Sequence, residues 1–322
     1  MGVEDSRERA KYPNILSSLT KREGIYYNKL MRKVSISGYG YIDRLPLERS
    51  FELLARAGAE AVDFPLYEYV HKMTCYLAGE GTLEERALAV RRAAERAGLV
   101  IGQTHAPFCY LEESNMEEII RAYADSIRVT KILGAEGVVM HPVKFGGCYG
   151  DRRRQECFDL NVEIFRAVAP VLRETGVKGL LENMFAKAVE PDGYKRLYPT
   201  IYSTGEELRR AADILGDSFG VCLDTGHANI TGEDIPLMIE TIGEKLLALH
   251  LHDNTGARDD HSPLYFGNIP FAETFAALKK VGYRGNINFE VNFEKVPEEH
   301  LETGFRYLTE IGRSVRKALD GE

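Results

Sequence analysis

Short apolar runs in this chain end, one after another, in an acid or a histidine. Stretches with helical spacing separate these runs, and the residues that close or follow them include His105, His141, Glu182, Asp224, His250 and Glu290. Short apolar runs that alternate with helical stretches are typical of buried parallel strands joined by helices. Catalytic and metal-binding groups of a (β/α)8 barrel lie at the carboxyl ends of its strands. The pattern therefore predicts a fold and the position of a site together.

The alternation predicts eight strands in a single α/β domain. We expect strands at 33–37, 61–64, 99–104, 137–141, 179–182, 220–224, 246–251 and 286–290, and helices at 46–57, 82–97, 116–133, 154–175, 271–280 and 298–319, with a further helix starting at Thr204. Strict alternation requires parallel pairing with right-handed crossovers. An open doubly wound sheet is the alternative, but no GxGxxG follows the first strand and no Walker loop occurs. We therefore predict a (β/α)8 TIM barrel over residues 32–322, preceded by an N-terminal extension at 1–31.

Two long segments interrupt the alternation. Residues 183–204 contain Pro191, Gly193 and Pro199, and residues 254–266 form a second polar stretch. Structureless loops of this length are uncommon inside a domain and often cover a site. We expect both segments to act as lids.

Composition limits the cellular location and the classes of partner. The net charge of −8 and the pI near 5.6 argue against a protein that coats nucleic acid or an anionic membrane. No stretch approaches the roughly 20 apolar residues of a membrane span, and the charged start lacks the apolar segment of a secretory signal. The five cysteines are odd in number and include no CxxC pair. They predict a cytoplasmic protein without a disulfide framework.

Four of the strand-end residues form a candidate metal site. Glu182, Asp224, His250 and Glu290 offer three carboxylates and one imidazole. This oxygen-rich set suits Mn²⁺, Mg²⁺ or Co²⁺ and accepts Zn²⁺. The alternative for each acid is a helix cap or an ion pair with a nearby base. Four successive strand ends fit that alternative poorly, because several unpaired buried acids carry a large desolvation cost. We predict a divalent metal ion, with Mn²⁺ preferred.

Further polar residues follow the same strands. His105 and His141 each precede a proline within two residues, which ends the strand. Both can bond substrate hydroxyls, the alternative being a structural histidine. Lys144, just beyond His141, would favour an anionic group on the substrate.

The later strands carry a second set of such residues. His227 follows Asp224 at a spacing that brings it over the same pocket, and Asp259 and His261 share a polar loop that could equally be a solvated turn. We expect His227, Asp259 and His261 to contact substrate. His252 lies on the same strand face as His250 and is left open between a substrate contact and a supporting role.

These motifs occur in a definite order along the chain: Thr-His-Ala-Pro at 104–107, His-Pro at 141–142, Leu-Glu-Asn at 181–183, Leu-Asp-Thr-Gly-His-Ala at 223–228, His-Leu-His-Asp-Asn at 250–254, Asp-Asp-His at 259–261, and Glu290. Together they resemble the xylose isomerase-like (β/α)8 barrel superfamily over residues 33–318. That superfamily includes sugar phosphate isomerases and epimerases, ketose 3-epimerases, inosose dehydratases and an endonuclease that cuts DNA at abasic sites.

The resemblance to the ketose epimerases implies a role for each matching residue. Glu182, Asp224, His250 and Glu290 would hold the metal ion, Glu182 and Glu290 would also form the acid/base pair, and His227 would contact substrate. The implied activity is a metal-dependent sugar isomerase or epimerase that removes a proton next to a carbonyl and passes through an enediolate. A small sugar is then the expected partner, and Tyr12, Tyr26 and Tyr27 make the extension a candidate contact with a second copy.

Two other activities are compatible with the same residues. The abasic-site endonuclease binds three zinc ions, and its ligand types are matched here when His105, His141, His227, Asp259 and His261 are added to the four metal residues. The chain departs from that enzyme in Pro-Val-Lys-Phe after His141, where it has Pro-Gly-Ser-His, and in Ser-Ile-Ser-Gly at 35–38, where it has Gly-x-His-x-Ser. A lyase or dehydratase would start from the same proton abstraction and then expel a leaving group.

Overall fold

Eight parallel strands close into a barrel in the computed structural model, which describes residues 32–69, 72–73, 76–111 and 114–321. Their order around the sheet is β11-β10-β7-β6-β5-β2-β1-β12, and a parallel bridge between Leu251 and Phe289 joins the two ends of this order. The predicted (β/α)8 fold is confirmed, while the extension at 1–31 lies outside the described residues. The strands are β1 Val34–Ser37, β2 Ala61–Pro65, β5 Val100–His105, β6 Gly137–Met140, β7 Lys178–Glu182, β10 Phe219–Asp224, β11 Leu246–His250 and β12 Ile287–Phe289.

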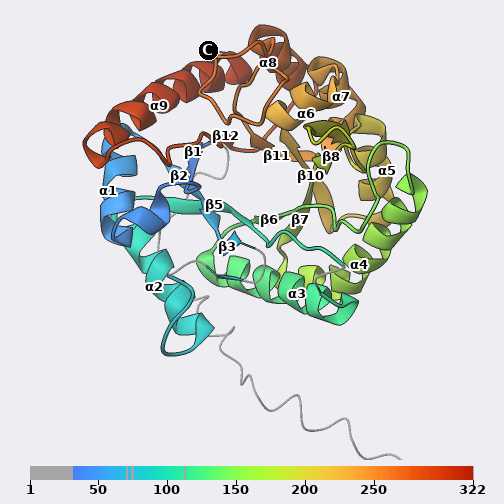
Figure 1. Ribbon diagram of the computed structural model, residues 1–322. Helices are drawn as coiled ribbons and strands as arrows, with labels where there is room; N and C mark the ends of the chain where they lie inside the picture. The colour runs from blue at the N-terminus through green and yellow to red at the C-terminus, as the bar shows by residue number, and fades with distance from the viewer. Residues whose placement is uncertain (1–31, 70–71, 74–75, 112–113, 322) are drawn as a thin grey trace, which may run out of the picture. The chain divides into compact units, whose positions relative to one another are not determined.

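Helices surround the barrel on its outside (Figure 1). They are α1 Leu47–Ala57, α2 Leu83–Arg96, α3 Met116–Leu133, α4 Arg154–Thr175, α5 Gly205–Leu215, α6 Thr225–Thr231, α7 Ile235–Ile242, α8 Phe271–Lys280 and α9 Glu298–Asp320, with short 3-10 turns at Ile42–Arg44 and Gly243–Lys245. Thr82 and Glu85 form the capping box expected at the start of α2, with N···O distances of 3.1 and 2.8 Å. None of the helices in the described part of the chain is both long and apolar enough to cross a membrane.

The interior of the barrel has an apolar floor below a polar layer. Val139, Leu180, Cys222 and Ala248, from four neighbouring strands, form a buried cluster separate from the larger core between strands and helices. Alternation along each strand places the residue two positions further on the same side. Those residues are His141, Glu182, Asp224 and His250, so the predicted site residues project inward just above the floor.

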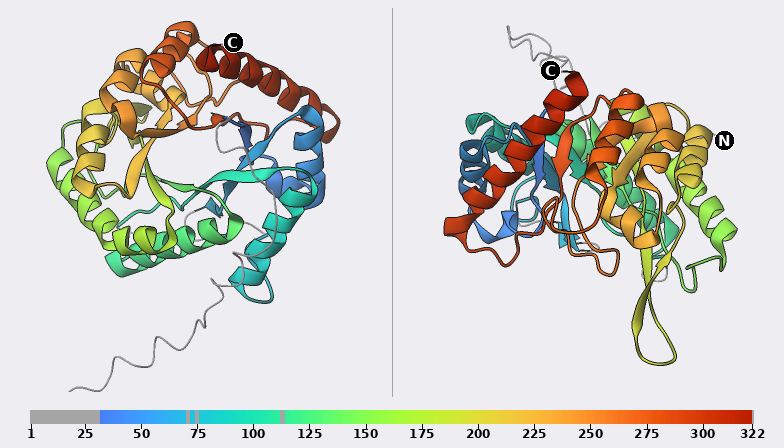
Figure 2. Two further views of the ribbon diagram at one scale, coloured as in Figure 1. Left: turned by 180° about the vertical axis from the view of Figure 1, so that it is seen from behind. Right: turned by 90° about the horizontal axis from the view of Figure 1, so that it is seen from above.

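The segment at 183–204, which we predicted to be structureless, contains an antiparallel hairpin. Its strands are β8 Phe185–Val189 and β9 Lys195–Pro199. Pro191, Asp192 and Gly193 form the loop, in which the amide of Gly193 donates to the carbonyl of Glu190 at 2.8 Å and Gly193 has a φ of 83°. A three-residue loop that ends in a left-handed glycine is a common hairpin connection. The hairpin extends well away from the barrel (right panel of Figure 2).

Two helices and a short hairpin were also missed. Helices α6 and α7 fill the segment between β10 and β11, and a short hairpin pairs β3 Tyr67–Tyr69 with β4 Lys72–Met73. Asp234 caps α7 by accepting a hydrogen bond from the amide of Leu237 at 3.0 Å, and Pro236 lies in the first turn. Both are start signals that identify this helix in retrospect.

The cysteine prediction needs a correction, because Cys148 and Cys157 form a disulfide. Cys157 lies in the first turn of α4, and Cys148 lies in the segment before this helix. An odd cysteine count therefore did not exclude a local pair nine residues apart in sequence. Cys109 and Cys222 are buried free thiols, as expected for Cys222, and Cys75 lies outside the described residues.

Candidate metal and catalytic site

The four predicted metal ligands come from four consecutive strands of the barrel. Glu182, Asp224 and His250 are the last residues of β7, β10 and β11, and Glu290 directly follows β12. One ligand atom from each residue lies within 4.8 Å of the others, and all four side chains are buried. Glu182 and Glu290 therefore occupy the two ends of an arc, with Asp224 and His250 between them.

The three carboxylates converge on one imidazole nitrogen. Nδ1 of His250 lies 2.9 Å from Oε1 of Glu182, 3.1 Å from Oε2 of Glu290 and 3.9 Å from Oδ2 of Asp224. That nitrogen can carry only one proton. A single imidazole hydrogen bond consequently cannot satisfy all three carboxylates.

The charges of this group fit a divalent cation. Burial raises the pKa of Glu182, but His250 and His141 outweigh it and hold that pKa well below its usual range. Burial also raises the pKa of Asp224, and His227 and His252 outweigh it in the same way. Ionised carboxylates without solvent require compensating positive charge. Three carboxylates and an imidazole are also the donor types that hard and borderline divalent ions accept.

Asp63 is a site residue that our sequence analysis missed. This fully buried aspartate of β2 presents Oδ2 to Nε2 of His250 at 3.3 Å and to Nε2 of His105 at 2.8 Å. The same oxygen accepts hydrogen bonds from the side-chain amides of Gln103 and Asn288, both at 3.1 Å. The signal was an acid inside the apolar run Ala-Val-Asp-Phe, because a charge buried there requires partners. Asp63 therefore lies next to Nε2 of His250, while the three carboxylates lie next to Nδ1.

Two of the predicted substrate contacts lie beside this group. The ring of His105 stacks on His250 with centroids 4.6 Å apart. Nε2 of His141 lies 2.8 Å from Oε2 of Glu182, without the geometry of a hydrogen bond. Phe108, which is 40% exposed, stacks on His141 at 3.8 Å and forms part of the surface next to the site. That His105 and His141 contact substrate stays a prediction.

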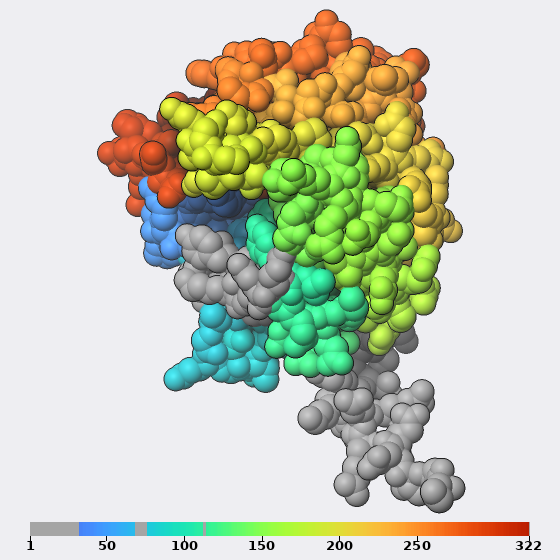
Figure 3. Space-filling model, turned by 45° about the vertical axis from the view of Figure 1, so that its right-hand side comes forward, coloured from blue at the N-terminus to red at the C-terminus, as the bar shows by residue number. Residues whose placement is uncertain are grey.

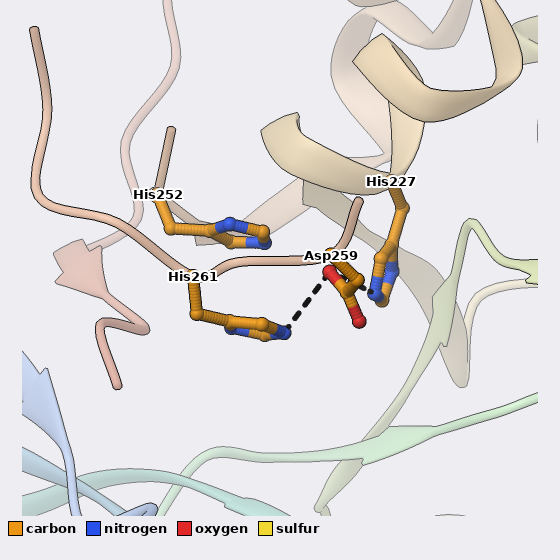
Figure 4. Close-up of side chains that lie close together, drawn as sticks. All are labelled: His227, His252, Asp259 and His261. Atoms are coloured by element: carbon orange, nitrogen blue, oxygen red, sulfur yellow. Dashed lines mark ion pairs between the residues drawn. The ribbon is translucent and has the colours of Figure 1, made fainter. Parts of the chain in front are cut away.

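The other predicted substrate residues form a second polar group with His252 (Figure 4). One ligand atom from each of His227, His252, Asp259 and His261 lies within 4.8 Å of the others. Nε2 of His261 and Nε2 of His227 face Oδ1 of Asp259 at 3.2 and 3.8 Å. Nδ1 of each of these two rings bonds a backbone carbonyl instead, that of Glu290 for His261 and that of Asn183 for His227. Such bonds fix the rings so that both Nε2 atoms point at the carboxylate.

His252 connects the two groups. Its Nε2 lies 2.9 Å from both carboxylate oxygens of Asp224, and its ring stacks on His261 at 3.9 Å. This contact gives a geometric basis for the supporting role of His252, in which it holds the Asp224 carboxylate. Gly226 makes the approach possible, because a Cβ atom at that position would collide with the His252 ring. The Asp-Thr-Gly-His motif is therefore partly a packing requirement.

A family model described as the xylose isomerase-like TIM barrel matches residues 51–311. The chain belongs to this family. The family assignment agrees with the resemblance found in the sequence motifs. It is consistent with the closed barrel and with polar residues at the carboxyl ends of the strands.

The relatives found by sequence include an uncharacterized protein that matches most of the chain and named epimerases that match short segments. An uncharacterized protein of Methanocaldococcus jannaschii is 29% identical over 254 residues, which cover 74% of this chain and 81% of that protein. The putative L-ribulose-5-phosphate 3-epimerase SgbU of Escherichia coli is 33% identical over 91 residues, 26% of this chain and 32% of that protein. An L-ribulose 3-epimerase of Methylomonas is 37% identical over 68 residues, 21% and 22% of the two chains.

Solved structures resemble the whole barrel. An L-ribulose 3-epimerase has a TM-score of 0.67 at 17% identity and covers 90% of this chain and 96% of its own. A D-psicose 3-epimerase has a TM-score of 0.66 at 14% identity, covering 88% and 99%. At these identities the likeness shows the fold.

Proposed function

We propose that this protein is a sugar isomerase or epimerase that depends on a divalent metal ion held by Glu182, Asp224, His250 and Glu290. The observation that carries the proposal is the placement of Glu182 and Glu290 at opposite ends of one arc, with ligand atoms within 4.8 Å. Two carboxylates so placed can approach a bound ketose from different sides. The short matches to a putative L-ribulose-5-phosphate 3-epimerase and to an L-ribulose 3-epimerase support a sugar as the substrate.

The chain's own residues supply the proton transfers. One glutamate removes the proton on the carbon next to the sugar carbonyl, which gives an enediolate. The other returns a proton from the opposite side in an epimerisation, or the proton moves between neighbouring carbons in an isomerisation. When bound, the cation would stabilise negative charge on the substrate oxygens. His105, His141, His227, Asp259 and His261 would orient the hydroxyls, and the imidazoles nearest Glu182 keep it ionised for its role as a base.

Solvent isotope exchange tests this proposal. The protein, loaded with Mn²⁺ and incubated in D2O with a panel of free and phosphorylated ketoses, should incorporate deuterium at the carbon next to the carbonyl of at least one. Product analysis then separates epimer, isomer and the eliminated product of a lyase. Absence of exchange from every ketose, with the metal bound, would refute the proposal.

A second candidate is favoured by one observation, the group of three histidines and one aspartate in Figure 4. A nitrogen-rich set of this kind suits zinc, so a multi-zinc hydrolase such as an abasic-site endonuclease is the alternative. Incubation of the zinc-loaded protein with duplex DNA that carries an abasic site tests it directly. Strand cleavage would favour the nuclease, and intact DNA together with ketose exchange would favour the epimerase.

A further inference from the structure

The edge of the site next to the β8–β9 hairpin is positively charged, in contrast to the acidic centre. Lys144 follows β6, and its backbone is fixed by hydrogen bonds from its amide to the carbonyl of Cys109 and from the amide of Leu111 to its carbonyl, at 3.3 and 2.9 Å. Its ammonium donates a 2.9 Å hydrogen bond to the carbonyl of Phe185. Figure 3 shows the yellow-green hairpin beside the green segment that follows β6.

A second lysine comes from the hairpin itself. Nζ of Lys187 lies 5.3 Å from the centroid of the Phe185 ring, so both lysines are in contact with the same residue. Burial and the proximity of Lys187 lower the pKa of Lys144 to about 8, while Glu182 and Asp259 act in the opposite direction. Among the described residues, Lys144 and Lys187 form no ion pair with a carboxylate. Because like charges repel, two cations that contact the same residue and form no ion pair of their own favour an anion near both of them.

Contacts between neighbouring residues connect the two lysines to Glu182 of the candidate site. The ring of Phe185 packs against His227 with centroids 5.1 Å apart, and Nδ1 of His227 lies 3.6 Å from Oε1 of Glu182. A contact path therefore runs from Glu182 through His227 and Phe185 to Lys144 and Lys187. An anionic group bound by these lysines would therefore lie a few residue contacts away from Glu182.

We propose that Lys144 and Lys187 bind an anionic group, a phosphate or a carboxylate, carried by the substrate at a distance from its reacting carbons. The assignment rests on the proposed sugar isomerase or epimerase activity for the identity of the rest of the substrate. The anion site itself can be tested without turnover. Lysine ammonium groups act as point charges that serve phosphate and carboxylate alike.

Titration calorimetry with inorganic phosphate as the probe tests the site in the full-length, metal-loaded protein. Lys144→Gln removes the charge but keeps a donor for the Phe185 carbonyl, so the hairpin contact can persist. It should weaken phosphate binding by about tenfold, because one of the two positive charges that attract the anion is removed. Lys187→Gln should also weaken it. Lys195→Gln, an exposed lysine on the same hairpin, makes the same change in net charge and should leave phosphate binding unchanged.

Three ligands then distinguish the sources of the anion. A phosphorylated ketose should bind more tightly than the free ketose if the group is phosphate, and a keto-uronate should do so if it is carboxylate. Equal affinity for the charged and free sugars would overturn the assignment. Phosphate affinity that is unchanged in Lys144→Gln, or no phosphate binding by the wild type, would overturn it as well. These binding results do not depend on deuterium exchange, so the two proposals can fail separately.

Discussion

Nε2 of His250 lies 3.3 Å from Oδ2 of Asp63, a carboxylate without solvent exposure. The opposite nitrogen of the same ring faces Glu182 at 2.9 Å. A histidine that binds metal through one nitrogen commonly bonds a carboxylate through the other, which fixes the ring and raises its basicity. Asp63 is the carboxylate nearest this second nitrogen of His250, and the side-chain amide of Gln103, which donates to Asp63, lies 2.9 Å from the same nitrogen.

Asp63→Asn should therefore weaken metal binding by about 10–100-fold. The test is a Mn²⁺ titration of the metal-stripped protein, with thermal unfolding to verify the fold. Asp151→Asn changes an exposed aspartate beyond β6 and serves as the control. Equal Mn²⁺ affinity in Asp63→Asn and the wild type would show that the contact does not support the site.

Replacing either candidate acid/base residue should stop proton exchange. Glu182→Gln and Glu290→Gln should each lower the rate of deuterium incorporation by about 10²–10⁴-fold at saturating metal, the usual contribution of a positioned general acid or base. Circular dichroism should show an intact fold. Glu163→Gln, on the exposed side of α4, should exchange like the wild type. Full exchange in both site variants would refute the assigned roles.

The pH dependence of phosphate binding should report Lys144. Inorganic phosphate carries at least one negative charge throughout the neutral and mildly alkaline range, and Lys144, with a pKa of about 8, loses its positive charge above that value. The affinity for phosphate should therefore fall as the pH rises through about 8. Lys144→Arg keeps its charge, so the fall should move to higher pH. Identical pH profiles for the two proteins would exclude Lys144 as the titrating group.

Gly226→Ala should destabilise the protein, because the new methyl group would meet the His252 ring. We expect a loss of about 1–3 kcal/mol in the free energy of unfolding, the usual cost of overpacking. Denaturant titration measures it. The loss should shrink when His252 is also replaced by alanine, since the double-mutant cycle isolates the collision. A penalty of the same size in both backgrounds would place the cost elsewhere.

The framework of the barrel was predictable because local signals agreed with one another. The helices at 116–133, 154–175 and 271–280 have the predicted bounds, and Gly134 and Gly176 end the first two in left-handed conformations. The juxtaposition of Glu182, Asp224, His250 and Glu290 was predictable for a topological reason. Residues at the carboxyl ends of parallel strands meet at one end of a barrel.

Several other features could not be predicted, because they depend on contacts between residues that the sequence alone does not pair. Asp63 and His250 are 187 positions apart in sequence, and the closure of the barrel brings them into contact. The loop Pro191-Asp192-Gly193 of the hairpin at 185–199 consists of turn-forming residues, a signal that our prediction of a structureless segment did not use. The Cys148–Cys157 pair depends on how the segment before α4 folds, which spacing alone does not fix. His252 had two open roles because its contact with Asp224 spans two strands.

The metal content of protein purified without chelator tests the central claim most directly. The account predicts about one equivalent of Mn²⁺ or a similar divalent ion per chain, lost in Asp224→Asn, because Glu182, Asp224, His250 and Glu290 form one oxygen-rich site. About two to three equivalents of zinc per chain, retained in part when Asp224 is replaced and reduced by His261→Ala, would contradict a single-metal epimerase and favour a multi-zinc hydrolase.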